Sequence, residues 1–342
     1  MWISAFAAAT LVASGPTEPL AARVSAALAN DKPGWVSWDV PAIGDQVACC
    51  WRSDRRSRPG SQRPHQESCS LDGNNVGMWN SREENSGLVF SGPNTLRVYV
   101  HGMGREVDRV QAFSARCAID ASGTVQHLYA VDPGQSVSFL SWLAKSSDST
   151  RVSGRRSNGA LTAIALHEAG AATPALEALA SGNLSQRLRE TAAFWLGNTR
   201  GQAGYEALVR LRTSSDAGFR EKLTFSFSQS PAPEASTSLI DMAKSDPSPR
   251  VRGQALFWIA QKAQKKTNAD VIRTAAVDDP DEDVKKKAVF ALSQIPGGEG
   301  VPDLIRVARE HKSREVRKQA MFWLGQSKDP RALAFFEKIL AR

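Results

Sequence analysis

The sequence predicts an α+β protein, in which a small antiparallel β-rich domain is followed by an all-α solenoid of stacked helix pairs. Short runs rich in valine and aromatic residues fill the first 156 residues, and all four cysteines lie there too. From residue 194 to residue 322, phenylalanines recur every 31 to 33 residues. A chain of 342 residues with 42% hydrophobic content has enough material for two domains.

The first fifteen residues are apolar and uncharged, and they end in Ala13-Ser14-Gly15 before Pro16. This pattern resembles the apolar region and small-residue cleavage site of a signal peptide, so we expect residues 1–15 to be removed on export. No basic residue precedes the apolar run, and a buried N-terminal helix is the alternative. No other run reaches the roughly 18 apolar residues that a membrane span requires.

The four cysteines are Cys49, Cys50, Cys69 and Cys117. We expect two disulfides that join Cys49 and Cys50 to Cys69 and Cys117 in either order, because a bridge between adjacent cysteines strains the intervening peptide. Free thiols and a zinc site are the alternatives, although zinc ligands are usually spaced two to four residues apart. Disulfides and a signal peptide together predict a periplasmic or secreted protein, with the cytoplasm as the alternative.

Residues 16–156 are predicted to form the β-rich domain. Helical spacing of apolar residues indicates short helices at 17–30 and 136–145. Gly102-Met103-Gly104-Arg105 predicts a hairpin turn between two of the strands. The predicted strands of this antiparallel sheet span residues 35–40, 47–51, 88–91, 95–101, 106–114 and 125–131.

Residues 157–342 are predicted to form five or six helix pairs. Val251, Ala255 and Ile259 show the helical spacing of apolar residues that marks the first helix of each pair, and this helix also carries the phenylalanine. Second helices follow at 175–180, 205–211, 239–243, 271–276, 304–308 and 333–340. One pair cannot cover its own apolar face, so neighbouring pairs must stack.

The repeated pattern is Asp-Pro-x-x-x-Val-Arg/Lys-x-x-Ala-x-Phe-Trp-Leu, with degenerate copies. It resembles the short HEAT-like repeats first named for phycobilisome lyases. The resemblance covers residues 157–342 and implies a fold rather than one activity, since that family contains scaffolds, adaptors and regulators as well as chromophore lyases. It also implies that the second helices line the concave side. Residues 107–140 are similar to part of exported bacterial HEAT-repeat proteins of unassigned activity.

Three columns of side chains follow from the repeat alignment. The resemblance places Arg189, Arg220, Arg252, Lys285 and Arg317 at a basic position that usually pairs with acids or carbonyls of an adjacent loop, so we expect a structural ladder. Trp195, Trp258 and Trp323 are expected in the core between repeats. The candidates for partner binding are a mixed-charge column on the second helices, namely Arg210, Asp241, Arg273, Arg306 and Glu337.

The formal net charge of +8 would tolerate an acidic partner, an anionic membrane or a nucleic acid. Nucleic acid is disfavoured because basic and acidic blocks alternate. We find no Gly-x-Ser-x-Gly, phosphate-binding loop or His-Glu-x-x-His motif, and the five histidines are scattered, although His101 and His127 could meet across a sheet. The sequence therefore predicts no enzyme activity, no cofactor and no metal.

The predicted function is that of a non-enzymatic, exported HEAT-repeat scaffold or adaptor that binds a protein or peptide partner. One alternative is an enzyme or auxiliary of the bilin-lyase type. The other is a basic HEAT solenoid that binds nucleic acid.

Overall fold

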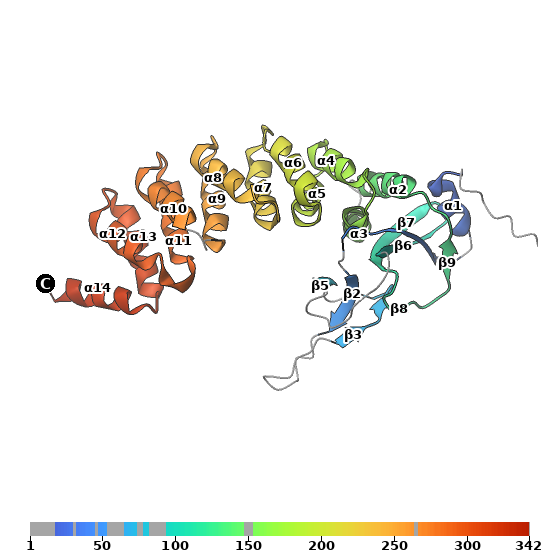
Figure 1. The fold of residues 1–342 in the computed structure, drawn as a ribbon, viewed down its shortest axis with the longest axis horizontal. Helices are drawn as coiled ribbons and strands as arrows, with labels where there is room; N and C mark the ends of the chain where they lie inside the picture. Colours follow the sequence, from blue (N-terminus) through green and yellow to red (C-terminus); the bar gives the residue numbers. More distant parts are fainter. Residues whose placement is uncertain are drawn as a thin grey trace, which may run out of the picture. The chain divides into compact units, whose positions relative to one another are not determined.

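The computed structural model describes residues 18–29, 32–44, 47–52, 65–73, 78–81, 94–146, 153–262 and 266–341. The predicted signal peptide and the predicted strand at 88–91 lie outside these residues. The chain divides into two compact units, Met1–Ala175 (unit 1) and Leu176–Arg342 (unit 2) (Figure 1). The predicted fold class is confirmed, because unit 1 holds a mainly antiparallel set of strands and unit 2 is helical.

The central sheet of unit 1 has the strand order β7-β6-β1-β9. Its strands are β1 (Gly34–Pro41), β6 (Thr95–Met103), β7 (Glu106–Ser114) and β9 (Val125–Leu128). The pairs β1–β6 and β6–β7 are antiparallel, as predicted, whereas β9 runs parallel to β1. Gly104 forms the predicted turn between β6 and β7, with a φ of 59° that favours glycine.

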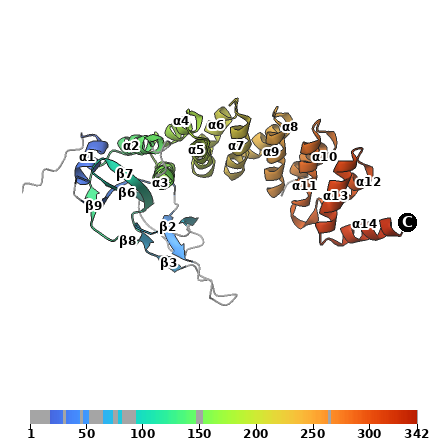
Figure 2. The same cartoon turned by 180° about the vertical axis from the view of Figure 1, so that it is seen from behind.

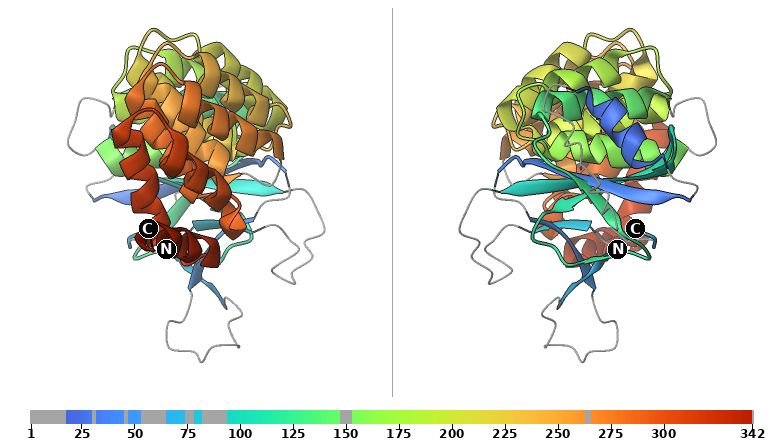
Figure 3. Two further views of the ribbon diagram at one scale, coloured as in Figure 1. Left: turned by 90° about the vertical axis from the view of Figure 1, so that its left-hand side faces the viewer. Right: turned by 90° about the vertical axis from the view of Figure 1, so that its right-hand side faces the viewer.

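Helices cover one face of this sheet (Figure 3). They are α1 (Leu20–Ala27), α2 (Pro133–Ser146) and α3 (Ser153–Leu166). The fully buried Trp38 donates its indole N–H to Ser136 Oγ at 2.9 Å, and Ser136 Oγ lies 2.9 Å from His167 Nε2. This buried chain of hydrogen bonds joins strand β1, helix α2 and the end of α3.

Helix α3 packs closely against β7. A Cβ atom at Gly159 would collide with the carbonyl oxygen of Val110, so only glycine permits this approach. Helix α3 lies within unit 1, although its residues from 157 onward fall in the range predicted for the solenoid. Compact units need not coincide with sequence domains, and the predicted domain limits stay a prediction.

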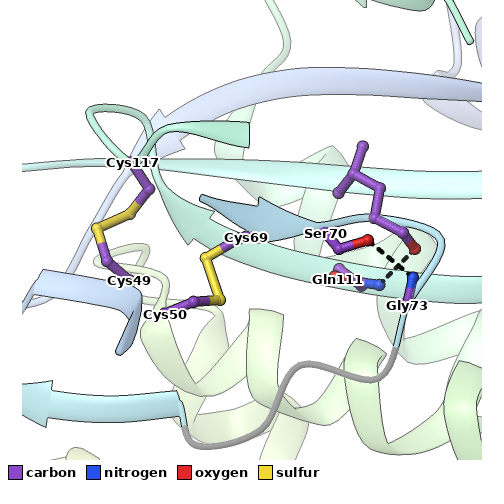
Figure 4. Close-up of a disulfide and its surroundings, with 8 residues drawn as sticks. Cys49, Cys50, Cys69, Ser70, Gly73, Gln111 and Cys117 are labelled. Atoms are coloured by element: carbon purple, nitrogen blue, oxygen red, sulfur yellow. Dashed lines mark hydrogen bonds between the residues drawn. A yellow bond between two sulfur atoms is a disulfide. The ribbon is translucent and has the colours of Figure 1, made fainter. Parts of the chain in front are cut away.

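Two disulfides lie on the opposite face of the sheet, Cys49–Cys117 and Cys50–Cys69 (Figure 4). They pack with Trp35, Tyr99 and Phe113 in one buried cluster. The segment that follows Cys69 is fastened to β7, because Gln111 Nε2 and Arg109 Nη1 each donate to the Leu71 carbonyl oxygen at 2.8 Å. Short strands complete this layer: β2 (Val47–Arg52), β3 (His65–Glu67), β4 (Cys69–Ser70), β5 (Met78–Ser81) and β8 (Ile119–Asp120).

The division between the units falls within α4 (Ala172–Ser181), and the rest of unit 2 is a row of helix pairs. The first helices, which carry the phenylalanines, are α5 (Gln186–Thr199), α7 (Ala217–Gln229), α9 (Pro249–Gln261), α11 (Glu282–Ser293) and α13 (Arg314–Gln326). The second helices are α6 (Gly201–Leu211), α8 (Ala235–Ser245), α10 (Lys266–Asp278), α12 (Val301–Glu310) and α14 (Pro330–Leu340). A 3-10 turn, η2 (Pro296–Gly298), separates α11 from α12.

Most first helices begin at a capping side chain. Ser185, Asp216, Asp281 and Ser313 each accept a hydrogen bond from a backbone N–H in the first turn of the helix that follows. In α9 a proline at the first helical position performs the same function, because it has no N–H to satisfy.

The first helices lie on the inner side of the arc that unit 2 describes (Figures 1 and 2). Each first helix packs extensively against the next first helix, whereas successive second helices touch only sparsely. Gly197 of α5 permits one of these approaches, because a Cβ there would collide with the Ser226 carbonyl oxygen of α7. The expectation that the second helices line the concave side is wrong, since the more tightly packed row must lie inside the curve.

Candidate partner-binding surface

The basic column of the first helices forms a ladder of ion pairs between repeats. Arg220 donates from Nε and Nη2 to both carboxylate oxygens of Asp246, each at 2.9 Å, and Arg252 binds Asp279 in the same way. Arg189 pairs with Asp216 at 3.2 Å. The predicted structural role of this column is confirmed at these three positions.

Hydrogen bonding sets the charge state of the ladder. Burial alone would raise the pKa of Asp246, but hydrogen bonds from Arg220 and from the Ser248 N–H lower it below its usual value. Donation of these hydrogen bonds to Asp246 in turn raises the pKa of Arg220. Both groups are thus held in their ionised forms.

The ladder changes at its C-terminal end. His311 occupies the position that Asp246 and Asp279 hold in earlier repeats. In the register of the ladder His311 is therefore the counterpart of Lys285. Arg317, one repeat later, donates to the carbonyl oxygens of His311 at 2.6 Å and Lys312 at 3.0 Å, just as Arg220 donates to those of Ser214 and Ser215. These contacts fasten each arginine to the loop that precedes its own helix.

Most of the predicted partner-binding column on the second helices is paired within the chain. Arg210 binds Glu177 at 2.7 and 2.8 Å, Asp241 lies 3.8 Å from Arg212, and Glu337 is exposed. Arg273 binds Asp303 and Asp270, and Arg306 also binds Asp303. A partner at these positions would have to compete with existing ion pairs, and their role in binding stays a prediction.

An open cavity of about 300 Å³ adjoins this column. Asp241 and Met242 of α8 line it, together with Arg212 and both members of the Arg220–Asp246 pair. The cavity is small and its charged groups are already neutralised by each other.

A continuous row of aromatic rings crosses the first helices. We call it the aromatic row; its members are Phe194, Trp195, Phe225, Phe257, Trp258, Phe290, Phe322 and Trp323. Neighbouring rings lie 4.8 to 5.9 Å apart between centroids, both within a helix and between repeats. Trp258 and Trp323 do pack against a ring of the preceding repeat as predicted, whereas the ring contact of Trp195 is with Phe194 of its own helix. None of the eight rings is fully buried, and Phe225 and Phe322 are 36% and 54% exposed.

The face that bears the aromatic row is positively charged. Arg187, Lys222 and Lys287 are exposed on it, and within the described part of the chain none of them has an ion-pair partner. Its acids have partners within the chain: Glu221 binds Arg250 at 2.8 Å, and Glu190 accepts from Gln186 at 2.6 Å. Asp283 and Glu315, at the positions equivalent to Arg187, lie 3.4 Å from Lys286 and 2.9 Å from Lys318. The sequence pattern does not reveal this surface, because it predicts tryptophans in the core and second helices on the concave side.

Unit 1 contains a separate polar cluster on its central sheet. Arg97 donates to both oxygens of Asp39 at 2.6 and 2.8 Å, and His127 Nδ1 lies 3.0 Å from Ser37 Oγ. Burial lowers the pKa of His127 despite the nearby Asp39. Ser37 is only 2% exposed and the carboxylate is held by Arg97, so this arrangement offers no accessible nucleophile.

The two sheet histidines do not meet. His101 lies on β6 and His127 on β9, with β1 between them, and His101 Nδ1 instead lies 2.7 Å from Asp108. Across the described residues, no group of three or more His, Cys, Asp or Glu side chains is arranged to hold a metal ion. In the same residues, no helix is long and apolar enough to cross a membrane.

Residues 269–342 match the family model described as HEAT repeats. The last helix pairs of unit 2 are therefore of the HEAT-repeat type. A comparison with curated proteins gives no match in sequence.

Several solved structures align with part of this chain. The complex of CpcE and CpcF of phycocyanin lyase from Nostoc sp. PCC7120 is 18% identical over 46% of this chain and 99% of that chain, with a TM-score of 0.36. YibA of Escherichia coli is 17% identical over 60% and 76%, with a TM-score of 0.36. Human deoxyhypusine hydroxylase, in complex with glycerol, is 14% identical over 60% and 90%, with a TM-score of 0.26. Similarity at this level carries no argument about the activity of these HEAT repeats.

Proposed function

We propose that this HEAT-repeat protein is a non-enzymatic, exported scaffold whose first helices bind an extended segment of a partner protein. The observation that carries the proposal is the aromatic row, in which rings from all five first helices stay partly exposed along one side of unit 2. Monomeric proteins rarely expose a continuous apolar stripe, and aromatic side chains supply much of the energy at binding surfaces.

The charges beside the row favour an acidic partner. Arg187, Lys222 and Lys287 lie on the same side of the first helices as the rings, so a segment that places apolar side chains on the rings would bring its carboxylates near cations. The Arg–Asp ladder, by contrast, is already neutral and holds the repeats in register. Unit 2 thus combines a framework of internally paired charges with a surface of exposed rings and unpaired cations, which a partner can bind.

The disulfides of unit 1 support export. Cys49–Cys117 and Cys50–Cys69 lie in a buried cluster with Trp35 and Leu71, and disulfides of this kind persist in oxidising compartments. The periplasm and the extracellular space are such compartments.

The test is selection of a phage-displayed library of random twelve-residue peptides on the full-length, oxidised protein. We expect enrichment of peptides with acidic and bulky apolar residues. The selected peptides should bind at least tenfold more weakly to a Phe225→Ala/Phe322→Ala variant, while an Arg210→Ala/Glu337→Ala variant on the second helices should bind them normally.

Circular dichroism and thermal melting of each variant establish that it is folded. A charge variant, Arg187→Glu/Lys222→Glu, changes only exposed side chains, and its affinity for the selected peptides tests the same surface independently. Failure to enrich any peptide, or equal binding by all variants, would overturn the proposal.

A further inference from the structure

The first helices are of two alternating kinds. Helices α7 and α11 share the pattern Lys-x-x-Phe-Ser/Ala-x-Ser-Gln at residues 222–229 and 287–294. Helices α5, α9 and α13 share Ala-x-Phe-Trp at residues 192–195, 255–258 and 320–323. The surface of unit 2 therefore repeats every second helix pair, although the fold repeats at every pair.

The ring geometry repeats with the same double period. The rings of Phe225 and Trp258 lie 4.8 Å apart at 39°, and those of Phe290 and Trp323 lie 4.8 Å apart at 41°. Within the next helix, Trp258 meets Phe257 at 4.9 Å and 70°, and Trp323 meets its preceding phenylalanine at 5.0 Å and 79°. Two clusters of three rings are thus nearly identical.

Polar groups flank both clusters in the same way. Lys222 lies one turn before Phe225 and Gln229 one turn after it, on one face of α7; Lys287 and Gln294 hold the same positions on α11. Each glutamine donates its Nε2 to the preceding serine at 3.1 Å. This contact, which both helices share, orients the glutamine amide and leaves the amide oxygen available as a hydrogen-bond acceptor.

We infer that unit 2 carries two equivalent subsites, one built on α7 and α9 and the other on α11 and α13, which bind two copies of one short motif in a single extended acidic peptide. Each subsite takes a bulky apolar side chain on its three rings. The lysine pairs with a neighbouring carboxylate, and the glutamine oxygen accepts a hydrogen bond from the peptide backbone. This inference rests on the proposed function and specifies its ligand.

The distance between the subsites sets the spacing of the motifs. Packed helices lie about 8–10 Å apart, so two repeats advance by about 16–20 Å. An extended peptide rises about 3.3 Å per residue, and about six residues therefore span the two subsites. Two linked motifs bind far more tightly than one, but only when the linker length allows both to be seated.

The experiment measures fluorescence anisotropy with the full-length, oxidised protein. The probes are labelled peptides in a serine-glycine background that contain one Asp-Leu motif, or two such motifs whose leucines are three, six or nine residues apart. We expect the six-residue spacing to bind at least tenfold more tightly than the single motif. Peptides with spacings of three and nine residues should bind with affinities within about threefold of that of the single-motif peptide.

Charge reversal at either subsite provides the matched test. Lys222→Glu or Lys287→Glu should each reduce the affinity for the peptide with six-residue spacing to that for the single-motif peptide. Lys244→Glu, on the second helix α8, should leave this affinity unchanged. Equal affinity at all spacings, or insensitivity to both lysines, would overturn the two-subsite inference even if library peptides still bind. If neither the designed peptides nor the library peptides bind, the proposed function itself is contradicted.

Discussion

Arg220 and Asp246 form a two-pronged ion pair between successive repeats, with both N–O distances at 2.9 Å and both side chains less than 10% exposed. Arg220 Nη1 also donates to the Ser214 carbonyl oxygen at 2.8 Å, so one side chain joins two loops. A charge this well buried persists only because its partner and its hydrogen bonds replace water. The pair consequently favours one arrangement of neighbouring repeats.

Removal of the arginine should therefore be costly. In Arg220→Met, Asp246 is left buried without its counter-ion, and we expect a loss of about 3–5 kcal/mol in the free energy of unfolding. Urea denaturation followed by circular dichroism measures this loss. The matched control is Arg210→Met, which removes an exposed arginine from its pair with Glu177 and should leave the urea midpoint almost unchanged. Equal losses in the two variants would refute a special role for the buried pair.

The same pair should make unit 2 sensitive to acid. The pKa of Asp246 is lower in the folded state than its ordinary value of 3.8. A carboxyl with a depressed pKa contributes stability that is fully present above the unfolded pKa and is lost as the pH falls towards the folded pKa. The melting temperature should thus fall between about pH 5 and pH 2.

Asp246→Asn isolates this contribution. The variant should melt at a lower temperature at neutral pH, but its melting temperature should depend less steeply on pH below 5 than that of the unchanged protein. Thermal melts in buffers of constant ionic strength compare the two slopes. Parallel curves would show that other carboxyl groups cause the acid sensitivity.

The repeat architecture was predictable because its signal is periodic. The phenylalanine spacing and the Arg–Asp ladder both depend on contacts between equivalent positions, which a single sequence displays when it repeats itself. The inner side of the arc was predicted wrongly. Curvature depends on how closely Gly197 lets two helices approach, and no spacing of apolar residues reports that distance.

The partial exposure of the aromatic row was harder to predict for a related reason. An aromatic side chain at helical spacing gives the same pattern whether it is buried or half exposed, so the sequence predicts Trp258 and Trp323 in the core. The polar cluster of Ser37, Asp39 and His127 depends on β9 pairing parallel to β1, a register that local sequence does not encode. In both cases the decisive contacts join elements that are far apart in the chain.

The two disulfides of unit 1 should differ in their contribution to stability. Cys49–Cys117 closes a segment of 68 residues and Cys50–Cys69 one of 19 residues. Chain-entropy arguments assign about 4 kcal/mol to the longer loop and about 3 kcal/mol to the shorter one. We expect Cys49→Ala/Cys117→Ala to lower the urea midpoint more than Cys50→Ala/Cys69→Ala does. Intact-mass measurement before and after reduction counts the bridges, and the opposite order of midpoints would contradict the entropic account.

Close packing of the first helices gives a prediction with an internal control. Gly197 of α5 and Gly325 of α13 occupy equivalent positions, nine residues after the buried apolar residue that opens each repeat pattern. A Cβ at Gly197 would collide with the Ser226 carbonyl oxygen, whereas a Cβ at Gly325 would meet nothing within 4 Å. Alanine stabilises a helix by up to about 1 kcal/mol relative to glycine when nothing else changes.

Gly325→Ala should therefore raise the melting temperature slightly. Gly197→Ala should lower the stability by about 1–3 kcal/mol, because the colliding atom belongs to a backbone and cannot rotate away. The same substitution thus has opposite effects at two equivalent positions, and differential scanning calorimetry of both variants measures them. A stabilising effect at both sites would mean that α5 and α7 are not in close contact, and the tightly packed inner row would then lose its explanation.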